Sequence, residues 1–217
     1  MATSIDGYID DTSESRLLLS NQDDFDRVDE VRAGVDAILV GANTIRRDNP
    51  RLLVRSGERQ EKRAHRRRPP HPIKVTLTGS GDLDPAAKFF TAGNTAKIVY
   101  TRDAAESAVR TALGHAAIVV AAGDPVDLGA VLDDLGERKV ERLMVEGGGT
   151  IHTQFLAAGL VDEIHLVIAP FLVGEPDAPR FVHPSRFPQN PAQPMTLAET
   201  RQIGDVVLLR YLIGSTP

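Results

Sequence analysis

The chain has 217 residues, of which 41% are hydrophobic and 25% are charged, and its formal net charge is −5. This composition is typical of a folded globular protein, and the acidic balance argues against a dedicated nucleic-acid binder, which usually presents a basic surface. The sequence contains no cysteine, which excludes disulfides, thiolate zinc sites and a cysteine nucleophile, and we predict no metal site. No stretch approaches the roughly 20 apolar residues of a membrane span, and the first residues do not form a secretory signal. We therefore expect a cytoplasmic enzyme or binding protein.

Short β-branched runs alternate with amphipathic segments along most of the chain. The runs are nearly continuous in apolar residues, which is typical of strands buried on both faces of a parallel sheet. The predicted strands are 36–41, 73–78, 97–101, 117–121, 142–146 and 164–169. Their alternation with helical segments predicts a mostly parallel sheet with right-handed crossovers. The last two runs, 195–201 and 206–212, predict an antiparallel hairpin.

Capping residues mark the helical segments between these strands. Ser20, Asp103 and Asp127 are predicted to begin three helices. Gly159 is predicted to end the helix that follows the strand at 142–146. The sequence has no internal repeat and no break in composition, so we predict a single domain over residues 1–217.

The run EGGGT at residues 146–150 lies where a buried strand gives way to a helix. Glycines allow positive φ and the close approach of a ligand, and the first N–H groups of a helix favour an anion. A cofactor pyrophosphate fits these conditions. A tight turn with close helix–sheet packing explains the glycines equally well, and the spacing is not the GxGxxG dinucleotide fingerprint.

A second junction, LVGANTIRRDNPRLLVR at residues 39–55, crowds several arginines into the loop that we expect after a buried strand. Arginines around one turn can hold a phosphate, or they can simply form a solvated charged turn. Both junctions follow parallel-type strands, at the sheet edge where α/β proteins collect ligands. The amino-terminal segment MATSIDGYIDDTSES contains a predicted Asp6-Gly7 turn, and its polar residues could face the same cleft. The arginine-rich segment 59–68 is expected to be a long solvated loop, and the alternative is a loop that closes over a phosphate.

Three blocks together carry a family resemblance. MATSIDGYI, VRAGVDAILVGANTIRRDNPRLLVR and LMVEGGGTIHTQFLAAGLVDEIHLVIAPFLVG, in this order and spacing, resemble the riboflavin-biosynthesis pyrimidine reductases of the dihydrofolate-reductase-like superfamily. The resemblance covers essentially the whole chain. It implies a three-layer α/β/α fold with a mostly parallel mixed central sheet and a carboxyl-terminal antiparallel hairpin. Because the zinc-ligand motifs of the deaminase are missing, a stand-alone reductase is expected.

The resemblance also implies an activity. Members of the family use NADPH to reduce the ribosyl group of 5-amino-6-(5-phosphoribosylamino)uracil, or of its 2,5-diamino-pyrimidinone counterpart, to a ribityl chain. The protein would mainly position the two reactants, because the cofactor carries the hydride. Relatives are commonly dimers, and the carboxyl-terminal strands offer an apolar surface or an unpaired edge, so a homodimer is expected.

Site residues follow from their places in the matching motifs. The positions expected on the cofactor side are Ala2, Thr44, Asp48, Thr78, Gly79, Ser80, Gly147, Gly148, Gly149, Thr150 and Ile151, with the segment 78–80 near the adenosine 2′-phosphate. The positions expected to contact substrate are Ser15, Arg32, Leu52, Arg55 and Glu146, with the two arginines on the ribose phosphate. Asp6 and Glu146 are the catalytic candidates for moving a proton. The alternatives are that Asp6 stabilises a turn and that Glu146 only orients the substrate.

The sequence also departs from the family pattern. Leu17 stands where many relatives have a tryptophan, and the chain begins close to the first block, so a short first strand is expected. Two other interpretations stay open: a related reductase of a pterin or a specialised metabolite, and a nucleotide-binding homologue without turnover. The arginine pair favours a phosphorylated substrate over a pterin.

Overall fold

The computed structural model describes residues 1–13, 15 and 17–214. Contacts divide the chain into two compact units, Met1–Asp26 with Gly148–Pro217, and Arg27–Gly147. We call the first the terminal unit and the second the central unit. Within the described residues, no helix has both the length and the apolar character needed to cross a membrane. The organisation of residues 1–217 as one domain stays a prediction.

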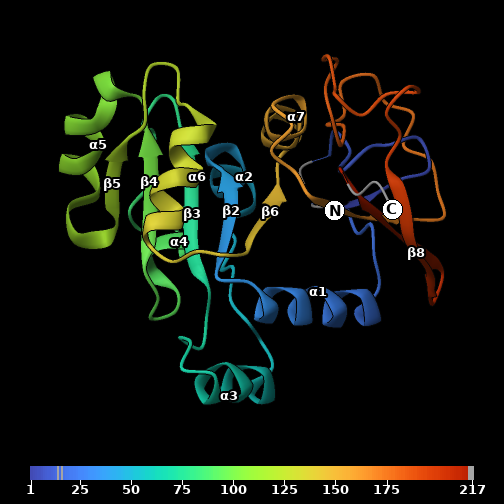
Figure 1. The fold of residues 1–217 in the computed structure, drawn as a ribbon, viewed down its shortest axis with the longest axis horizontal. Helices are drawn as coiled ribbons and strands as arrows, with labels where there is room; N and C mark the ends of the chain where they lie inside the picture. Colours follow the sequence, from blue (N-terminus) through green and yellow to red (C-terminus); the bar gives the residue numbers. More distant parts are fainter. Residues whose placement is uncertain (14, 16, 215–217) are drawn as a thin grey trace. The chain divides into compact units, whose positions relative to one another are not determined.

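The central unit contains a five-stranded sheet in which every pair of neighbouring strands is parallel (Figure 1). The strand order is β5-β4-β3-β2-β6. The strands are β2 (Ala37–Gly41), β3 (Ile73–Thr78), β4 (Lys97–Thr101), β5 (Ile118–Ala121) and β6 (Leu143–Gly147). Each lies within one residue of its predicted bounds, because a strand buried on both faces gives an uninterrupted apolar run.

Helices cover both faces of this sheet. The helices of the central unit are α2 (Ala42–Asp48), α3 (Gly57–His65), α4 (Lys88–Thr91), α5 (Glu106–Leu113) and α6 (Leu128–Glu137), with α1 (Gln22–Gly34) continuing from the terminal unit and short 3₁₀ turns at Asp103–Ala105 and Gly114–Ala116. Ile38 of β2 belongs to one apolar cluster with Ile45 of α2, Phe89 of α4 and Val109 of α5. On the other face, the Tyr100 hydroxyl donates to Asp134 of α6. This arrangement confirms the predicted α/β class, with helices on either side of the parallel strands.

Two of the three predicted helix caps need correction. Asp127 caps α6 as predicted, since its carboxylate accepts N–H groups from the first turn. Asp103 instead begins a 3₁₀ turn, and its carboxylate accepts the N–H of Gly123 at 2.9 Å. Ser20 lies one residue too early, because the side chain of Asn21 accepts the N–H that a cap must satisfy in α1. Sequence spacing therefore locates the start of a helix, but it does not show which of two adjacent polar side chains accepts the N–H group.

The expectation of a solvated loop over 59–68 is wrong. Most of this segment forms α3, which lies beyond the amino ends of the parallel strands in Figure 1. The side chain of Arg63 is buried, and its guanidinium donates to the carbonyl oxygens of Ala33, Val35 and Pro69. Because a buried arginine with three carbonyl acceptors is well satisfied, a charge-rich composition is compatible here with an ordered helix.

The terminal unit contains a mixed four-stranded sheet in the order β1-β7-β9-β8. Its strands are β1 (Ala2–Thr3), β7 (Glu163–Ile168), β8 (Thr196–Ile203) and β9 (Val206–Leu212), and its helix is α7 (Gly149–Ala157). β1 is short and parallel to β7, while β8 and β9 form the predicted antiparallel hairpin. Gly159, with φ of 68°, follows the end of α7 as predicted. The strands expected in one mixed sheet thus form two hydrogen-bonded sheets.

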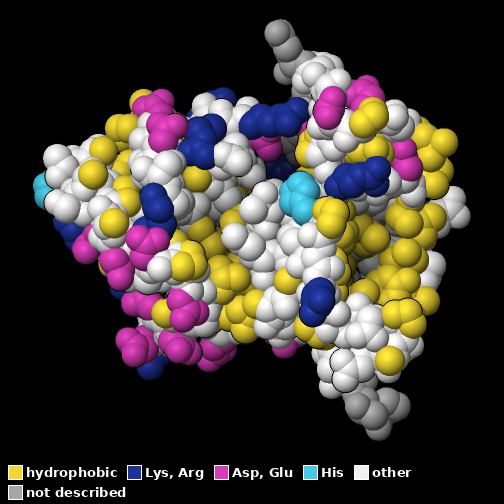
Figure 2. All heavy atoms as spheres, turned by 90° about the horizontal axis from the view of Figure 1, so that it is seen from above, with side chains coloured by type: hydrophobic (Ala, Val, Ile, Leu, Met, Phe, Trp, Pro, Cys, Tyr) yellow, Lys and Arg dark blue, Asp and Glu magenta, His cyan; other side chains and the backbone are white. Residues whose placement is uncertain are grey.

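One face of the terminal sheet is apolar and open. Val167, Ile203 and Leu208 form a small core on the inner face. By the pairing register, the opposite face carries Ile164, Leu166, Ile168, Leu197, Val207, Leu209 and Tyr211. Leu197 is 51% exposed and Val207 is 37% exposed. Figure 2 shows hydrophobic side chains in yellow gathered at the right, the side where Figure 1 draws β8.

Candidate active site

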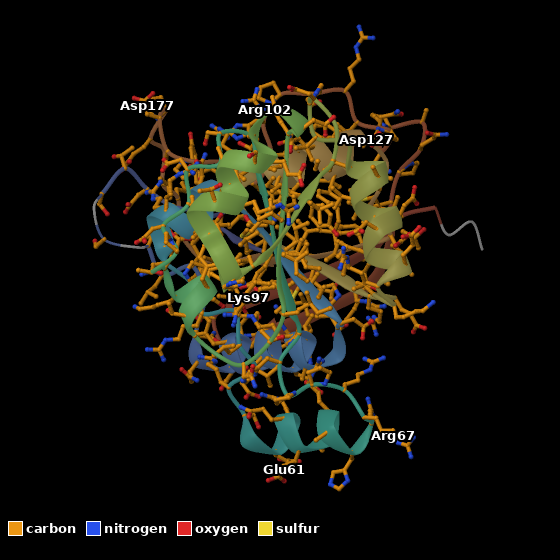
Figure 3. The ribbon with its side chains drawn as sticks, turned by 90° about the vertical axis from the view of Figure 1, so that its left-hand side faces the viewer. Glu61, Arg67, Lys97, Arg102, Asp127 and Asp177 are labelled. Atoms are coloured by element: carbon orange, nitrogen blue, oxygen red, sulfur yellow. The ribbon has the colours of Figure 1, made fainter. Side chains whose placement is uncertain are left out.

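The two glycine- and arginine-bearing junctions meet at one edge of the central sheet. β6 pairs directly with β2, and a bulge shifts the register so that Val40 lies beside Gly147. A Cβ added to Gly147 would lie 3.4 Å from the methyl group of Thr44, at the start of α2. Figure 3 shows Arg102 at this end of the sheet and Lys97 toward the other. The prediction that both junctions lie at the carboxyl ends of parallel strands is confirmed, and the structure adds that the two strands are neighbours.

The loop predicted after β2 is a helix instead. Thr44 and Asp48 both lie on α2, which ends where Asn49 adopts a left-handed conformation with φ of 43°. Asp48 is exposed at the end of this helix. The two arginines in the last turn of this seven-residue helix interact favourably with the negative end of the helix dipole. The same arginines made the sequence look like a charged loop.

Arg32 and Glu146 form a two-pronged ion pair. The Nε of Arg32 donates to Oε2 of Glu146 at 2.8 Å, and Nη2 donates to Oε1. Both side chains are largely sheltered, with 17% and 21% exposure. Burial works against the charged guanidinium, but the Glu146 carboxylate outweighs it and raises the pKa of Arg32. Because a bidentate pair fixes the planes of both groups, Glu146 has a defined orientation at the end of β6.

The segment 52–56 lies beside this pair. Leu52 is buried and has a positive φ of 49°, an uncommon conformation for leucine. Nη1 of Arg32 lies 3.5 Å from the carbonyl oxygen of Leu53. The side chain of Arg55 is 56% exposed. The central unit therefore brings together four of the five positions expected to contact substrate.

Asp29 is a residue of this cluster that the sequence did not reveal. Its carboxylate accepts the backbone N–H groups of Arg55 at 2.6 Å and Ser56 at 3.1 Å. Burial raises the pKa of Asp29, but these bonds and the Arg59 guanidinium outweigh burial, so the pKa lies below its ordinary value. Asp29 precedes Arg32 by three residues in α1, so helical spacing was the signal that could have linked them.

Two arginines flank the segment 78–80, which was expected near the adenosine 2′-phosphate. Nε of Arg102, the first residue after β4, donates to the carbonyl oxygen of Gly79 at 2.7 Å. Nη1 of Arg46 donates to the carbonyl oxygen of Asp82 at 2.5 Å. Arg102 was not predicted, although its place directly after a parallel strand was a usable signal.

The remaining glycine positions belong to the terminal unit. Gly148 begins α7 with φ of 97°, a conformation that favours glycine. A Cβ added to Gly149 would overlap the carbonyl oxygen of Arg180, so close chain packing also explains this glycine. Thr150 is exposed and Ile151 is buried in the first turn of α7. Both readings of the glycine run, close packing and a ligand cradle, remain compatible with this geometry.

Asp6 acts as an acceptor in the terminal unit. Its carboxylate accepts the Ser4 hydroxyl at 2.5 Å and the N–H groups of Val173 and Gly174 at 3.1 and 2.8 Å. The Ser4 hydrogen bond, followed by these N–H groups, holds the pKa of Asp6 below its ordinary value. Gly7 completes the predicted turn with φ of 84°. A carboxylate held ionised by donors suits turn stabilisation better than proton donation.

Two further predicted positions also lie in the terminal unit. Ala2 belongs to β1. Ser15 is exposed, and its carbonyl oxygen accepts the Ser13 hydroxyl at 2.9 Å. The predicted residues are therefore divided between the two units, with the arginine–carboxylate cluster entirely in the central one.

Charged and hydroxyl side chains at the carboxyl edge of a parallel sheet are typical of α/β proteins that bind small ligands there. The family comparison is more specific. A model described as the RibD C-terminal domain matches residues 1–209, and the chain belongs to this family. The resemblance predicted from the three sequence blocks is thereby confirmed.

Individual relatives agree with this membership. The chain is 36% identical over 179 residues to the 2,5-diamino-6-ribosylamino-4(3H)-pyrimidinone 5′-phosphate reductase of Archaeoglobus fulgidus, covering 82% of each protein. It is 34% identical over 177 residues to the reductase of the same name from Methanothermobacter thermautotrophicus, covering 82% of this chain and 78% of the relative. These relatives place the chain among the oxidoreductases of riboflavin biosynthesis.

A solved structure shares the fold. A pyrimidine reductase-like protein from Corynebacterium diphtheriae superimposes with a TM-score of 0.81 at 23% identity, covering 99% of this chain and 90% of that one. At this identity the likeness shows the fold alone. It matches the predicted fold class.

Proposed function

We propose that this protein is an NADPH-dependent reductase that converts the ribosyl group of a 5-amino-6-(5-phosphoribosylamino)pyrimidine to a ribityl chain. The single observation that carries the proposal is the cluster of Arg32, Glu146 and the segment 52–56 at the edge of the central sheet. It offers the exposed Arg55 for a phosphate and the Glu146 carboxylate, oriented by Arg32, for the sugar or amino groups. The prediction that both arginines bind the phosphate is narrowed here to Arg55. The family model spans both units, which supports their acting as one reductase domain.

The chemistry requires few reacting groups from the protein. Opening of the ribose ring breaks the C1′–O4′ bond, transfers the proton of the glycosidic nitrogen to O4′ and leaves a C1′=N double bond. When bound, NADPH would supply the hydride that C1′ accepts, and a proton on the nitrogen would complete the amine. In this proposal Arg55 binds the 5′-phosphate, and Arg32 fixes Glu146 against the sugar. The protein lowers the barrier mainly by orientation and electrostatics.

Each unit, taken by itself, has residues whose chemistry suits a dinucleotide. Gly147 allows close approach beside Thr44, and Gly148 introduces α7, whose first N–H groups have no partner within the helix. Arg46 and Arg102 flank the segment 78–80 and would add positive charge near an adenosine 2′-phosphate. This charge supports a preference for NADPH over NADH.

The open apolar face of the terminal sheet supports a homodimer. Exposed leucine and valine side chains on a sheet face are costly in water and are commonly covered by a symmetric copy. Sedimentation analysis would then give twice the mass of the chain. A monomer at micromolar concentration would remove this part of the proposal.

Steady-state kinetics test the proposed activity. The purified protein would be mixed with NADPH and with either 5-amino-6-(5-phosphoribosylamino)uracil or its 2,5-diamino counterpart, and absorbance of the reduced nicotinamide followed. We expect oxidation with at least one of the two. Dihydrofolate in parallel is expected to give none, since a pterin lacks the phosphate. Turnover of dihydrofolate alone would favour a pterin reductase, and no turnover with any of the three would favour a nucleotide-binding homologue.

A further inference from the structure

Asp29 is a buried carboxylate with more donors around it than a helix residue normally has. Its side chain is 2% exposed. It accepts two successive backbone N–H groups, from Arg55 and Ser56, and the Nη1 of Arg59 at 3.1 Å. Nε of Arg55 lies 3.7 Å from the same carboxylate. A buried carboxylate is costly unless donors surround it, and here four are within reach.

The donors identify what the carboxylate holds. The Arg55 N–H belongs to the peptide before Arg55 and the Ser56 N–H to the peptide after it, so the two bonds fix the peptide planes on both sides of Arg55. Ser56 is also the cap of α3. Nε of Arg55, on the side of the guanidinium nearest its own backbone, lies within ion-pair distance of the Asp29 carboxylate. A bidentate grip on a phosphate can use the two Nη atoms of an arginine. Asp29 contacts Arg55 through its backbone N–H and its Nε.

The whole segment is anchored in the same way, one residue after another. Arg32, one turn after Asp29 in α1, reaches the carbonyl oxygen of Leu53. Nε2 of Gln60 donates to the carbonyl oxygen of Val54 at 3.0 Å. Asp29 holds the next two residues. One face of α1 thus carries both the carboxylate that fixes Arg55 and the arginine that fixes Glu146.

We propose that Asp29 is a positioning residue that presents Arg55 to the phosphate of the substrate. The proposal rests on the proposed function for the identity of that substrate. Asp29 itself touches neither reactant. Its contribution is preorganisation, because an arginine whose backbone is already fixed, and whose Nε lies beside a carboxylate, loses less conformational freedom when it binds a phosphate.

The sharpest test replaces the charge and keeps the shape. Asp29→Asn is expected to raise KM for the phosphoribosyl substrate about tenfold, with kcat within about twofold of the parent and KM for NADPH unchanged. In an Arg55→Ala background the same replacement is expected to have no further effect on KM, because the positioned group is gone. An equal rise in KM in both backgrounds would overturn the proposal.

Asp36 offers a matched control. Its carboxylate also accepts two successive N–H groups, from Glu141 and Arg142, and pairs with Arg68 at 3.2 Å. Asp36→Asn removes the same kind of anchor away from the segment 52–56. It is expected to lower stability without changing KM. If both replacements lowered stability and neither changed KM, Asp29 would be structural only, and the proposal would be wrong.

Binding of ribose 5-phosphate, measured by calorimetry, separates this proposal from the proposed function. Weaker binding in Asp29→Asn and in Arg55→Ala than in the parent would support the role of Asp29 even if the pyrimidine were never reduced. Reduction of the pyrimidine with unaltered ribose 5-phosphate binding in Asp29→Asn would overturn it. Should Asp29→Asn not fold, Asp29→Glu keeps the charge and displaces the carboxylate by one methylene. The same selective rise in KM is expected, and an unchanged KM would overturn the proposal.

Discussion

The two units handle buried and exposed surface in opposite ways. In the central unit every residue of β2 is buried, because helices cover both faces of the parallel sheet. In the terminal unit β8 is exposed at nearly all positions, and one sheet face remains open. A sheet covered on both faces leaves its strand ends as the place for polar chemistry, whereas an open face offers area for a partner. The proposed substrate cluster and the proposed dimer surface follow this division.

The two units also use paired carboxylates differently, one at the edge of a sheet and one between strands. Glu146 in the central unit is held by one side chain, Arg32, at the carboxyl edge of the sheet. Glu163 in the terminal unit is paired with Arg210 and His165 on the strands themselves, and the Arg210 hydrogen bond, despite burial, lowers the pKa of Glu163 to about 2. The first arrangement orients a group at a ligand edge. The second ties neighbouring strands together.

The largest effect on stability is expected at Gly149 of the terminal unit, where an added Cβ has no room. Gly149→Ala would force a methyl group into the Arg180 carbonyl, and we expect a loss of about 3 kcal/mol in the free energy of unfolding, as for overpacked sites. Urea titration followed by circular dichroism measures it. The control is Gly136→Ala in α6, where no atom lies within 4 Å, and which should gain up to about 1 kcal/mol. An unchanged stability of Gly149→Ala would contradict the close packing of the terminal unit.

Loss of the ion pair in the central unit should affect substrate use next most strongly. Arg32→Ala leaves the sheltered carboxylate of Glu146 without this partner. We expect a fall in kcat/KM that corresponds to a loss of about 1–3 kcal/mol in transition-state stabilisation. As the control, Arg210→Ala breaks an arginine–glutamate pair in the terminal unit and should leave kcat/KM unchanged. If both replacements lowered kcat/KM equally, the proposal that only the Arg32–Glu146 pair serves the substrate would be wrong.

A buried lysine should give the central unit its own pH dependence. Lys74 is fully buried in β3, and burial lowers its pKa from 10.5 to about 8. The unfolded chain therefore binds this proton more tightly, so stability should rise between pH 8 and 10.5, on the order of 1 kcal/mol. Urea titrations across this range should show the rise in the parent and in Lys62→Met, at an exposed position of α3, but not in Lys74→Met. A rise that persists in Lys74→Met would assign it to another group.

The smallest effect on turnover is expected for the acid of the terminal unit. Asp6→Asn removes a carboxylate whose pKa is lowered, chiefly by Ser4, so the parent gains stability from it above pH 3.8 and loses that gain as pH falls through the lowered value. The variant should be less stable at neutral pH and less sensitive to acid, with kcat within about twofold of the parent. A fall in kcat of about a hundredfold in a folded variant would instead make Asp6 a proton donor.

Local patterns predicted the strands well and the site only in part. The parallel strands were found because burial on both faces leaves an uninterrupted signal in sequence. The helices α2 and α3 were missed because their arginines suggest solvated loops. In α3, however, the buried Arg63 is satisfied by three carbonyl oxygens from outside the helix. Helix and strand periodicity contains no information of that kind.

The contacts of the site are nonlocal in the same way. Arg32 and Glu146 were each singled out by family resemblance, but 114 positions separate them, and their pairing emerged only in the structure. Asp29 matched no motif, and its role depends on backbone N–H groups that are present at nearly every residue. A sequence can show which side chains are available, but the partner of a buried charge is fixed by the fold.

Isotope transfer tests the central claim most directly. The protein would be incubated with NADPH deuterated at both C4 positions and with the phosphoribosylaminopyrimidine that supports turnover, and the product analysed by mass spectrometry and NMR. The account predicts one deuterium on C1′ of a ribityl chain whose phosphate is intact. Deuterium at any other carbon, or a product that keeps its ribosyl ring, would contradict it.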